Sequence, residues 1–187
     1  MSAASARRVT VFCGSGLPEH PAFVAAAADL GRGLAERGVE VVYGGAGVGL
    51  MGAMADAALE ADGRVIGVIP DELAGREQAY GGITELHVVD SLPERKVLLV
   101  ELADGFVVLP GGLGTLDELF EVAVRAQVGL HDKPIVVVDV EGFFGPLVAF
   151  LDHAVAAGLM AERHRSLVEV VASVDDALDR LFGARPG

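Results

Sequence analysis

Cysteine, tryptophan and long apolar runs are scarce or missing in this chain. Cys13 is the one cysteine among 187 residues, so a disulfide framework is excluded and a reducing compartment is expected. No apolar run approaches the roughly 18 residues of a membrane-spanning helix, and the stretch MSAASARRVT has no apolar signal-peptide core. We therefore expect a cytoplasmic protein without a membrane partner.

Positive charge is also scarce. The chain carries 14 Lys and Arg against 27 Asp and Glu, a formal net charge of −13. Because non-specific nucleic-acid binding needs a basic surface, we expect no nucleic-acid partner. A phosphate site in such a chain has to act locally, through helix N-termini and one or two basic side chains.

Short apolar segments alternate with Ala- and Leu-rich helical stretches. The expected strands are RRVTVFCGS, VEVVYGG, RVIGVIP, TELHVVD, GFVVLPGG, KPIVVVDV and LVEVVAS. They are nearly continuous apolar runs, which is typical of parallel strands covered on both faces. The alternation predicts an α/β fold, a single doubly wound, Rossmann-like parallel sheet flanked by helices. We expect residues 1–187 to form one domain, with a flexible N-terminus at residues 1–7 and a loop at residues 71–85.

The 25 glycines gather where expected strands end. The cluster CGSG follows the first strand, YGGAGVGLMG the second and LPGGLGT the fifth. Ligands of open parallel sheets bind beyond the carboxyl ends of the strands, so three clusters at that edge predict a cradle for a phosphorylated ligand. The alternative is that the glycines only form tight strand–helix turns.

Several shorter motifs bear on this choice. Residues 47–52 match G-x-G-x-x-G after a strand, which keeps an NAD(P)-dependent oxidoreductase open, whereas the absence of a Gly-Lys pair argues against a P-loop. Thr115 and Glu118 have the Thr-x-x-Glu spacing of a capping box, which predicts that Thr115 caps a helix. Arg95 and Lys96 stand in the first turn of another predicted helix, where cations oppose the helix dipole unless an anion or carboxylate is near.

The segment PGGLGTLDE resembles the PGGxGTxxE signature of the Lonely Guy family, the cytokinin riboside 5′-monophosphate phosphoribohydrolases. The segments VYGGAGVGLMGAMADAAL, VIGVIPDEL, TELHVVDSLPERK and AQVGLHDKPI also resemble that family. The resemblance implies hydrolysis of the N-glycosidic bond of plain or N6-modified adenosine 5′-monophosphates, releasing the free base (cytokinin or adenine) and ribose 5-phosphate. It also implies a homodimer or larger homo-oligomer, for which the apolar face of residues 122–130 is a candidate surface.

The same resemblance implies roles for individual residues. Arg95 and Glu118 would be the catalytic pair. The implied nucleotide-binding residues are Glu77, Lys96, Gly111, Gly112, Leu113, Gly114, Thr115, Leu116 and Asp117, together with Gly14, Ser15, Gly45 and Met51. Glu121 lies one helical turn after Glu118 and is either a second carboxylate at the ribose or a surface charge.

The chemistry of ribosyl C–N cleavage suits these residue types. Positive charge builds on the ribose in the transition state, where a carboxylate such as Glu118 can stabilise it and orient or deprotonate the attacking water. N–H groups of Gly112, Gly114 and Thr115 would hold the 5′-phosphate. Arg95 is a poor proton donor because guanidinium stays charged, so we expect it to orient Glu118 or to stabilise charge on the leaving base.

We expect neither a metal nor a cofactor. The five histidines are scattered without metal-ligand spacing. Members of the Lonely Guy family were often labelled lysine decarboxylases, but nothing marks a Schiff-base lysine, and Lys96 and Lys133 are the only two lysines. The family usually has His at the position of Pro93 and a Trp-rich segment at Ala123 and Arg125, which leaves the preferred base open. A non-catalytic nucleotide carrier on the same scaffold is the alternative function.

Overall fold

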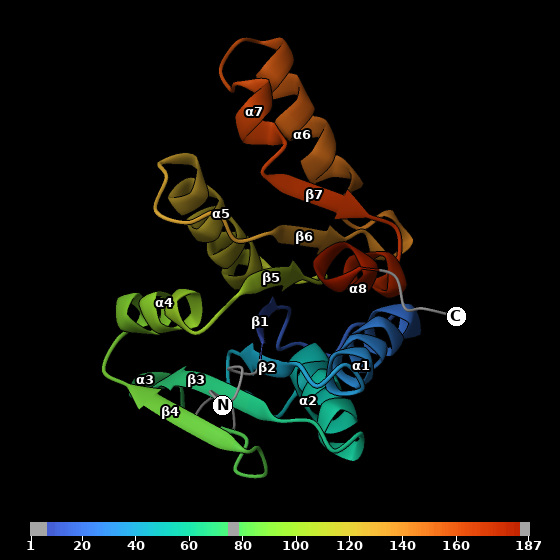
Figure 1. The fold of residues 1–187 in the computed structure, drawn as a ribbon, viewed down its shortest axis with the longest axis vertical. Helices are drawn as coiled ribbons and strands as arrows, with labels where there is room; N and C mark the ends of the chain where they lie inside the picture. Colours follow the sequence, from blue (N-terminus) through green and yellow to red (C-terminus); the bar gives the residue numbers. More distant parts are fainter. Residues whose placement is uncertain (1–6, 75–78, 184–187) are drawn as a thin grey trace, which may run out of the picture.

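Seven strands form one parallel sheet in the computed structural model, which describes residues 7–74 and 79–183 (Figure 1). Their order across the sheet is β4-β3-β2-β1-β5-β6-β7, and every neighbouring pair is parallel. The strands are β1 (Arg8–Phe12), β2 (Glu40–Tyr43), β3 (Val65–Pro70), β4 (Glu85–Val89), β5 (Gly105–Val108), β6 (Ile135–Val138) and β7 (Val168–Val171). The predicted doubly wound α/β fold is confirmed.

Helices cover both faces of the sheet (Figure 1). One face carries α1 (Pro21–Ala35), α2 (Gly49–Glu60) and α8 (Val174–Phe182), and the other carries α4 (Leu92–Glu101), α5 (Leu113–Gln127) and α6 (Gly145–Ala156). Shorter connecting helices are α3 (Asp71–Ala74), α7 (Glu162–Arg165) and the 3₁₀ helix η1 (Val140–Gly142). Across residues 7–74 and 79–183, no helix has the length and apolar character needed to cross a membrane.

The expected loop at residues 71–85 is only partly a loop. Its first four residues form α3, directly after β3, and its last residue begins β4. Residues 75–78 lie outside the described part of the chain. A helix of one turn is too short to leave an apolar periodicity in the sequence, which is why the prediction missed it.

Burial on both faces explains why the central strands are apolar. Along β2, Val41 and Tyr43 pack on the side of α1 and α2, and Val42 packs on the side of α4 and α5. β4 stands at the edge of the sheet, where its residues are less buried and polar side chains are tolerated. The hydrophobic core is therefore divided by the sheet into two layers.

The chain reverses its direction across the sheet after β4. Strands β1 to β4 are added towards one edge, and β5 to β7 continue from β1 towards the other edge. The helices that follow β1 and β5 therefore leave towards opposite faces and open a crevice beyond the carboxyl ends of these strands. The Oγ1 of Thr10 in β1 donates a buried hydrogen bond of 2.8 Å to the carbonyl of Leu99, which fastens α4 beside this crevice.

Candidate active site

Arg95 and Glu118 form a buried ion pair between α4 and α5. Nη2 of Arg95 lies 3.8 Å from Oε1 of Glu118, and the two residues are 7% and 8% exposed. Arg95 also donates from Nε to the carbonyl of Val68 (3.1 Å) and from Nη2 to the carbonyl of Gly44 (3.3 Å). These carbonyls stand near the carboxyl ends of β3 and β2, so the sheet itself holds the guanidinium in place.

Gly44 belongs to this site although the sequence analysis did not select it. A Cβ built on Gly44 would lie 2.2 Å from Nη2 of Arg95 and 2.9 Å from Cε of Met51. A side chain at this position would displace the guanidinium from its carbonyl partner. The signal in the sequence was the Gly44–Gly45 pair directly after the second strand, which marks a close approach to the backbone.

The start of α4 explains how two cations are tolerated in a first helical turn. Ser91 is the N-cap, and its Oγ accepts from the N–H of Glu94, while the Glu94 carboxylate accepts from the N–H of Asp90. This Ser-x-x-Glu cap is similar to a capping box: it satisfies the N–H of Glu94 in the first turn and the N–H of Asp90, directly before the N-cap. The turn is thus capped by its own side chains while Arg95 reaches inward to Glu118.

The capping role predicted for Thr115 is wrong. Helix α5 begins at Leu113 with Gly112 as its N-cap, so Thr115 is the third helical residue and is buried. Gly112 has no side chain and no side-chain cap is present. The first N–H groups of α5 therefore have no partner within the helix, the arrangement that binds anions.

Open space surrounds this helix start. A Cβ built on Gly112 or Gly114 would meet no atom within 4 Å, and Leu113 is 87% exposed. Gly111 differs, because a Cβ there would lie 2.0 Å from Oγ1 of Thr115. Gly111 is therefore required by packing, whereas Gly112 and Gly114 leave room in front of the helix.

The three glycine clusters meet at one edge, as predicted. The N–H of Gly14 donates to the carbonyl of Pro110 (3.0 Å), and the N–H of Met51 donates to the carbonyl of Gly14 (3.4 Å). Ser15 packs against Gly49, and the carbonyl of Gly45 accepts from the N–H of Tyr80 (3.0 Å). The loops after β1, β2 and β5 are thus joined by hydrogen bonds around the crevice.

A second row of charges lies outside the buried pair. Nζ of Lys96 lies 3.1 Å from Oδ2 of Asp117 and 3.4 Å from Oε2 of Glu121. Nε of Arg125 lies 2.7 Å from Oε1 of Glu121. The hydrogen bond to Asp117 raises the pKa of Lys96, and the hydrogen bond from Arg125, aided by Lys96, lowers the pKa of Glu121. Both shifts favour the charged forms of Lys96 and Glu121.

The remaining predicted residues have different surroundings. Leu116 is partly buried against the core of the α4–α5 face, and Met51 is almost fully buried beside Gly44. Glu77 lies outside the described residues. Cys13 is buried at the end of β1, and burial first, then the negative charge of Glu118, raises the pKa of its thiol, so it is an inert core residue.

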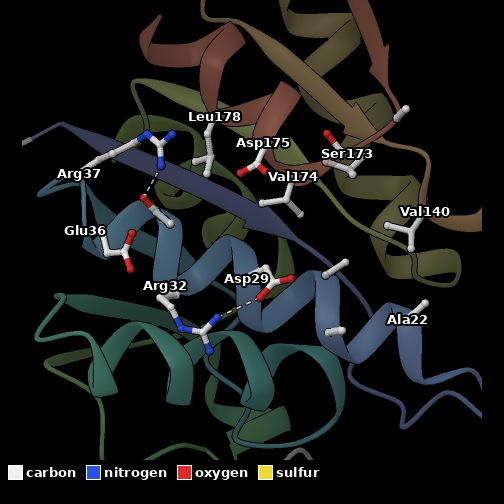
Figure 2. Close-up of a pocket in the computed structure, with 15 residues that line it drawn as sticks. Ala22, Asp29, Arg32, Glu36, Arg37, Val140, Ser173, Val174, Asp175 and Leu178 are labelled. Atoms are coloured by element: carbon white, nitrogen blue, oxygen red, sulfur yellow. Dashed lines mark hydrogen bonds and ion pairs between the residues drawn. The ribbon is translucent and has the colours of Figure 1, made fainter. Parts of the chain in front are cut away.

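Two hollows on the surface differ in their position relative to the predicted site residues. A small hollow of about 260 Å³ beside the α5 N-terminus is lined mainly by apolar groups, including Gly111, Gly112, Phe23 and Phe143. A larger hollow of about 530 Å³ lies between α1 and α8, on the sheet face opposite α4 and α5 (Figure 2). On its rim, Nη1 of Arg32 and Oδ1 of Asp29 lie 2.9 Å apart, and none of the predicted site residues lines it.

Within the described ranges, no group of three His, Cys, Asp or Glu side chains is placed to hold a metal ion. The predicted residues that lie together at this edge of the sheet are the Arg95–Glu118 pair and the glycines at the N-terminus of α5.

Comparison with known proteins identifies the family. A family described as "Possible lysine decarboxylase" matches residues 51–181. A cytokinin riboside 5′-monophosphate phosphoribohydrolase of Rhodococcoides fascians is 42% identical over 173 residues, which is 92% of this chain and 87% of the relative. The chain belongs to the Lonely Guy family. The enzyme named LOG from Oryza sativa subsp. japonica is 43% identical, covering 87% of this chain and 67% of that relative.

Solved structures share the fold more widely than the Lonely Guy family. A molybdenum cofactor binding protein from Rippkaea orientalis superposes with a TM-score of 0.71 at 20% identity, covering 95% of this chain and 96% of that one. A molybdenum cofactor carrier protein from Chlamydomonas reinhardtii gives a TM-score of 0.69 at 24% identity, covering 94% and 95%. At these identities the likeness concerns the fold, and it carries no assignment of a ligand.

Proposed function

We propose that this chain hydrolyses the N-glycosidic bond of adenosine 5′-monophosphates, plain or N6-modified, to the free base and ribose 5-phosphate. The observation that carries the proposal is the buried Arg95–Glu118 pair, placed beside an α5 N-terminus that glycines leave open. The names of the Rhodococcoides and Oryza relatives support the same activity.

The substrate phosphate fits the N-terminus of α5. The first N–H groups of α5, which have no partner within the helix, and the helix dipole favour a dianion, and the absence of side chains at Gly112 and Gly114 leaves room for it. Because the chain is acidic overall, this local site has to supply the attraction. Binding energy from the phosphate then positions the anomeric carbon for reaction.

Glu118 suits the reacting centre. As the C1′–N bond breaks, the ribose gains oxocarbenium character, which a carboxylate on one side of the sugar stabilises. The water oxygen bonds to C1′, and Glu118 accepts the proton that the water loses. Arg95, held by the carbonyls of Val68 and Gly44, keeps Glu118 oriented and ionised and offers positive charge to the departing base.

The description of the matching family as a possible lysine decarboxylase is a poor fit to these residues. Pyridoxal phosphate would require a neutral lysine amine as the Schiff-base partner. Lys96 is engaged by Asp117 and Glu121, which raises its pKa, and Nζ of Lys133 donates to the carbonyl of Val100 (2.8 Å).

A single chromatographic assay tests the proposal. The protein is incubated with AMP, isopentenyl-AMP and adenosine, and free base is measured over time. We expect base from both monophosphates and at least about 100-fold less kcat/KM for adenosine, since the phosphate interactions are lost. Equal turnover of adenosine would contradict the phosphate site, and binding of AMP without base release would favour a nucleotide carrier.

A homodimer or larger homo-oligomer is part of the proposal, as is a cytoplasmic location. Phe120 and Val124 are exposed one turn apart on α5, and the exposed Val128 and Leu130 follow at and beyond its C-terminal end. Such an apolar stripe suits a subunit interface. Light scattering coupled to size exclusion measures the mass of wild type and Val124→Asp, and a monomeric wild type would contradict this part.

A further inference from the structure

The short segment between α5 and β6 reaches both helices that carry the candidate catalytic pair. From this segment, Nζ of Lys133 donates a hydrogen bond of 2.8 Å to the carbonyl of Val100, in the last turn of α4. Nε2 of His131 lies 3.0 Å from the carbonyl of Val122, in α5. One short stretch of chain thus contacts both α4 and α5.

The imidazole ring of His131 joins these two contacts. The N–H of Lys133 donates to Nδ1 of His131 (3.2 Å), so Nδ1 is the acceptor and Nε2 carries the hydrogen that is donated to Val122. The ring packs against Phe106 of β5, with ring centroids 5.5 Å apart. Burial lowers the pKa of His131, which favours the neutral ring that this chain of hydrogen bonds requires.

The space between α4 and α5 is incompletely filled. A small hollow that admits no water is lined by Phe12 of β1, by Lys96, Leu99 and Val100 of α4, and by Glu118, Glu121 and Val122 of α5. Such a gap lacks the van der Waals contacts that fix the spacing of elements elsewhere in a core. The two residues whose carbonyls are bound, Val100 and Val122, border this hollow from different helices. Fewer side-chain contacts are therefore available here to set the spacing of α4 and α5.

We propose that His131 and Lys133 are positioning residues, which hold α4 and α5 at a fixed spacing and thereby set the geometry of the buried ion pair. The inference rests on the proposed function, in which that pair acts on the nucleotide. Val122 lies one turn after Glu118, so a hydrogen bond to its carbonyl restrains the part of α5 that carries the carboxylate.

The test measures kcat and KM for AMP cleavage in wild type and Lys133→Met, which keeps a long side chain but removes the donor. We expect kcat to fall about tenfold, because a small displacement far from the chemistry misplaces the carboxylate. The loss stays moderate, since the Thr10 hydroxyl still binds the carbonyl of Leu99 in α4. KM should change less than about threefold, because the phosphate site at the α5 N-terminus keeps its groups. Lys133→Arg keeps a cationic donor and should recover most of the lost kcat.

Arg37→Met is the matched control. Nη1 of Arg37 donates to the carbonyl of Gly33 (3.1 Å) in the last turn of α1, on the sheet face opposite α4 and α5. Like Lys133→Met, the substitution removes a cation that binds a carbonyl near a helix C-terminus, but α1 carries neither residue of the catalytic pair. We expect a similar fall in the midpoint of thermal unfolding and a kcat within about twofold of wild type.

His131→Asn tests the other half of the link. The side-chain oxygen of Asn can replace Nδ1 as the acceptor for the N–H of Lys133, whereas the donor to Val122 is lost. We expect kcat to fall about three- to tenfold. Because both residues act through one chain of hydrogen bonds, the double variant with Lys133→Met should lose less than the product of the two single losses.

Four results would overturn the inference: an unchanged kcat in Lys133→Met, an equal loss in Arg37→Met, a Lys133→Arg variant no more active than Lys133→Met, or fully independent losses in the double variant. A wild-type protein that releases no base would instead contradict the proposed function on which the inference rests, so the two failures are distinguishable. Thermal unfolding of each variant shows that the rates refer to folded protein.

Discussion

Helices α2 and α5 both begin at a glycine-rich turn after a strand, but the protein packs closely against the glycines of α2 and leaves space beside Gly112 and Gly114 of α5. At α2, a Cβ on Gly49 would lie 2.2 Å from the carbonyl oxygen of Ser15, and one on Gly52 would lie 2.6 Å from that of Gly47. At α5, a Cβ on Gly112 or Gly114 would meet nothing within 4 Å. Close packing therefore requires the glycines at the start of α2, whereas before α5 it requires Gly111 but not Gly112 or Gly114.

The difference shows why the glycine motif alone misleads. Residues 47–52 match the dinucleotide fingerprint, but contacts within the protein account for Gly49 and Gly52. Gly112 and Gly114 match no nucleotide fingerprint of that type, yet they border an open helix N-terminus with Glu118 one turn further along α5. Space around the absent Cβ shows that packing requires glycine at positions 49 and 52 but not at positions 112 and 114, which spacing in the sequence could not show.

The largest expected effect is the loss of AMP cleavage when Glu118 of α5 is replaced. Glu118→Gln keeps the shape of the side chain but removes the charge that stabilises the ribose and accepts the proton. We expect kcat for AMP to fall about 1,000-fold, as for the loss of a general base, with AMP affinity nearly unchanged. Single-turnover base release and calorimetric AMP binding measure the two quantities.

Glu60→Gln is the control for that substitution, because Glu60 is an exposed carboxylate at the end of α2. It should leave kcat within about twofold, as surface substitutions far from a site usually do. Retained activity in Glu118→Gln would return Glu118 to a purely structural role.

The second prediction concerns stability at α2. Gly49 has a φ of +62° and abuts the Ser15 carbonyl, so Gly49→Ala combines backbone strain with a clash. We expect the free energy of unfolding to fall by about 3 kcal/mol, the scale of combined strain and overpacking. Urea unfolding measures the loss. Gly145→Ala, at a helix start where a Cβ meets nothing within 4 Å, is the matched control and should change it by less than about 0.5 kcal/mol.

The sheet and the grouping of the glycine clusters could be predicted from the sequence. The apolar runs of the central strands predicted the sheet, because burial on both faces leaves no alternation to confuse with another fold. The fold in turn brought the three glycine clusters to one edge, as predicted. The identity of Arg95 and Glu118 as a pair came from the resemblance to a family, and their contact of 3.8 Å agrees with it.

The partners of Arg95 and the position of the helix caps could not be predicted from local sequence, because they depend on contacts and helix boundaries set by the whole fold. The carbonyls of Val68 and Gly44 that hold Arg95 are set by the stacking of strands, and no local pattern reveals them. The capping box was assigned to Thr115 and Glu118, whereas the same spacing at Ser91 and Glu94 forms the real cap. Local spacing could not reveal that Thr115 is not a cap, because helix α5 starts at Leu113, two residues before Thr115, with Gly112 as its N-cap.

The third prediction tests the open space at α5. Gly112→Ala and Gly114→Ala place a methyl group where the proposed phosphate binds, while the backbone at both positions accepts an L-residue. We expect KM for AMP to rise about tenfold with kcat little changed, the behaviour of lost substrate binding. Stability should stay within about 0.5 kcal/mol. Unchanged KM in both variants would mean that the phosphate is held elsewhere.

The smallest expected effect concerns how the two helices are held in place. Helix α2 packs on α1 through close backbone contact, with a Cβ on Gly31 only 2.1 Å from the carbonyl oxygen of Met54, whereas α5 is tied to α4 partly by the ionic row through Glu121. The pKa of Glu121 is lowered in the folded state, first by Arg125 and then by Lys96. Its contribution to stability is therefore present above its unfolded pKa and lost as pH falls through the folded pKa.

Since the pair is partly exposed, we expect Glu121→Gln to cost only about 0.5 kcal/mol at pH 7. Urea unfolding of wild type and variant at pH 7 and at about pH 3 measures the difference, which should vanish at the lower pH. A difference of equal size at both pH values would show that Glu121 supports α5 by packing, as the glycines support α2, and not by charge.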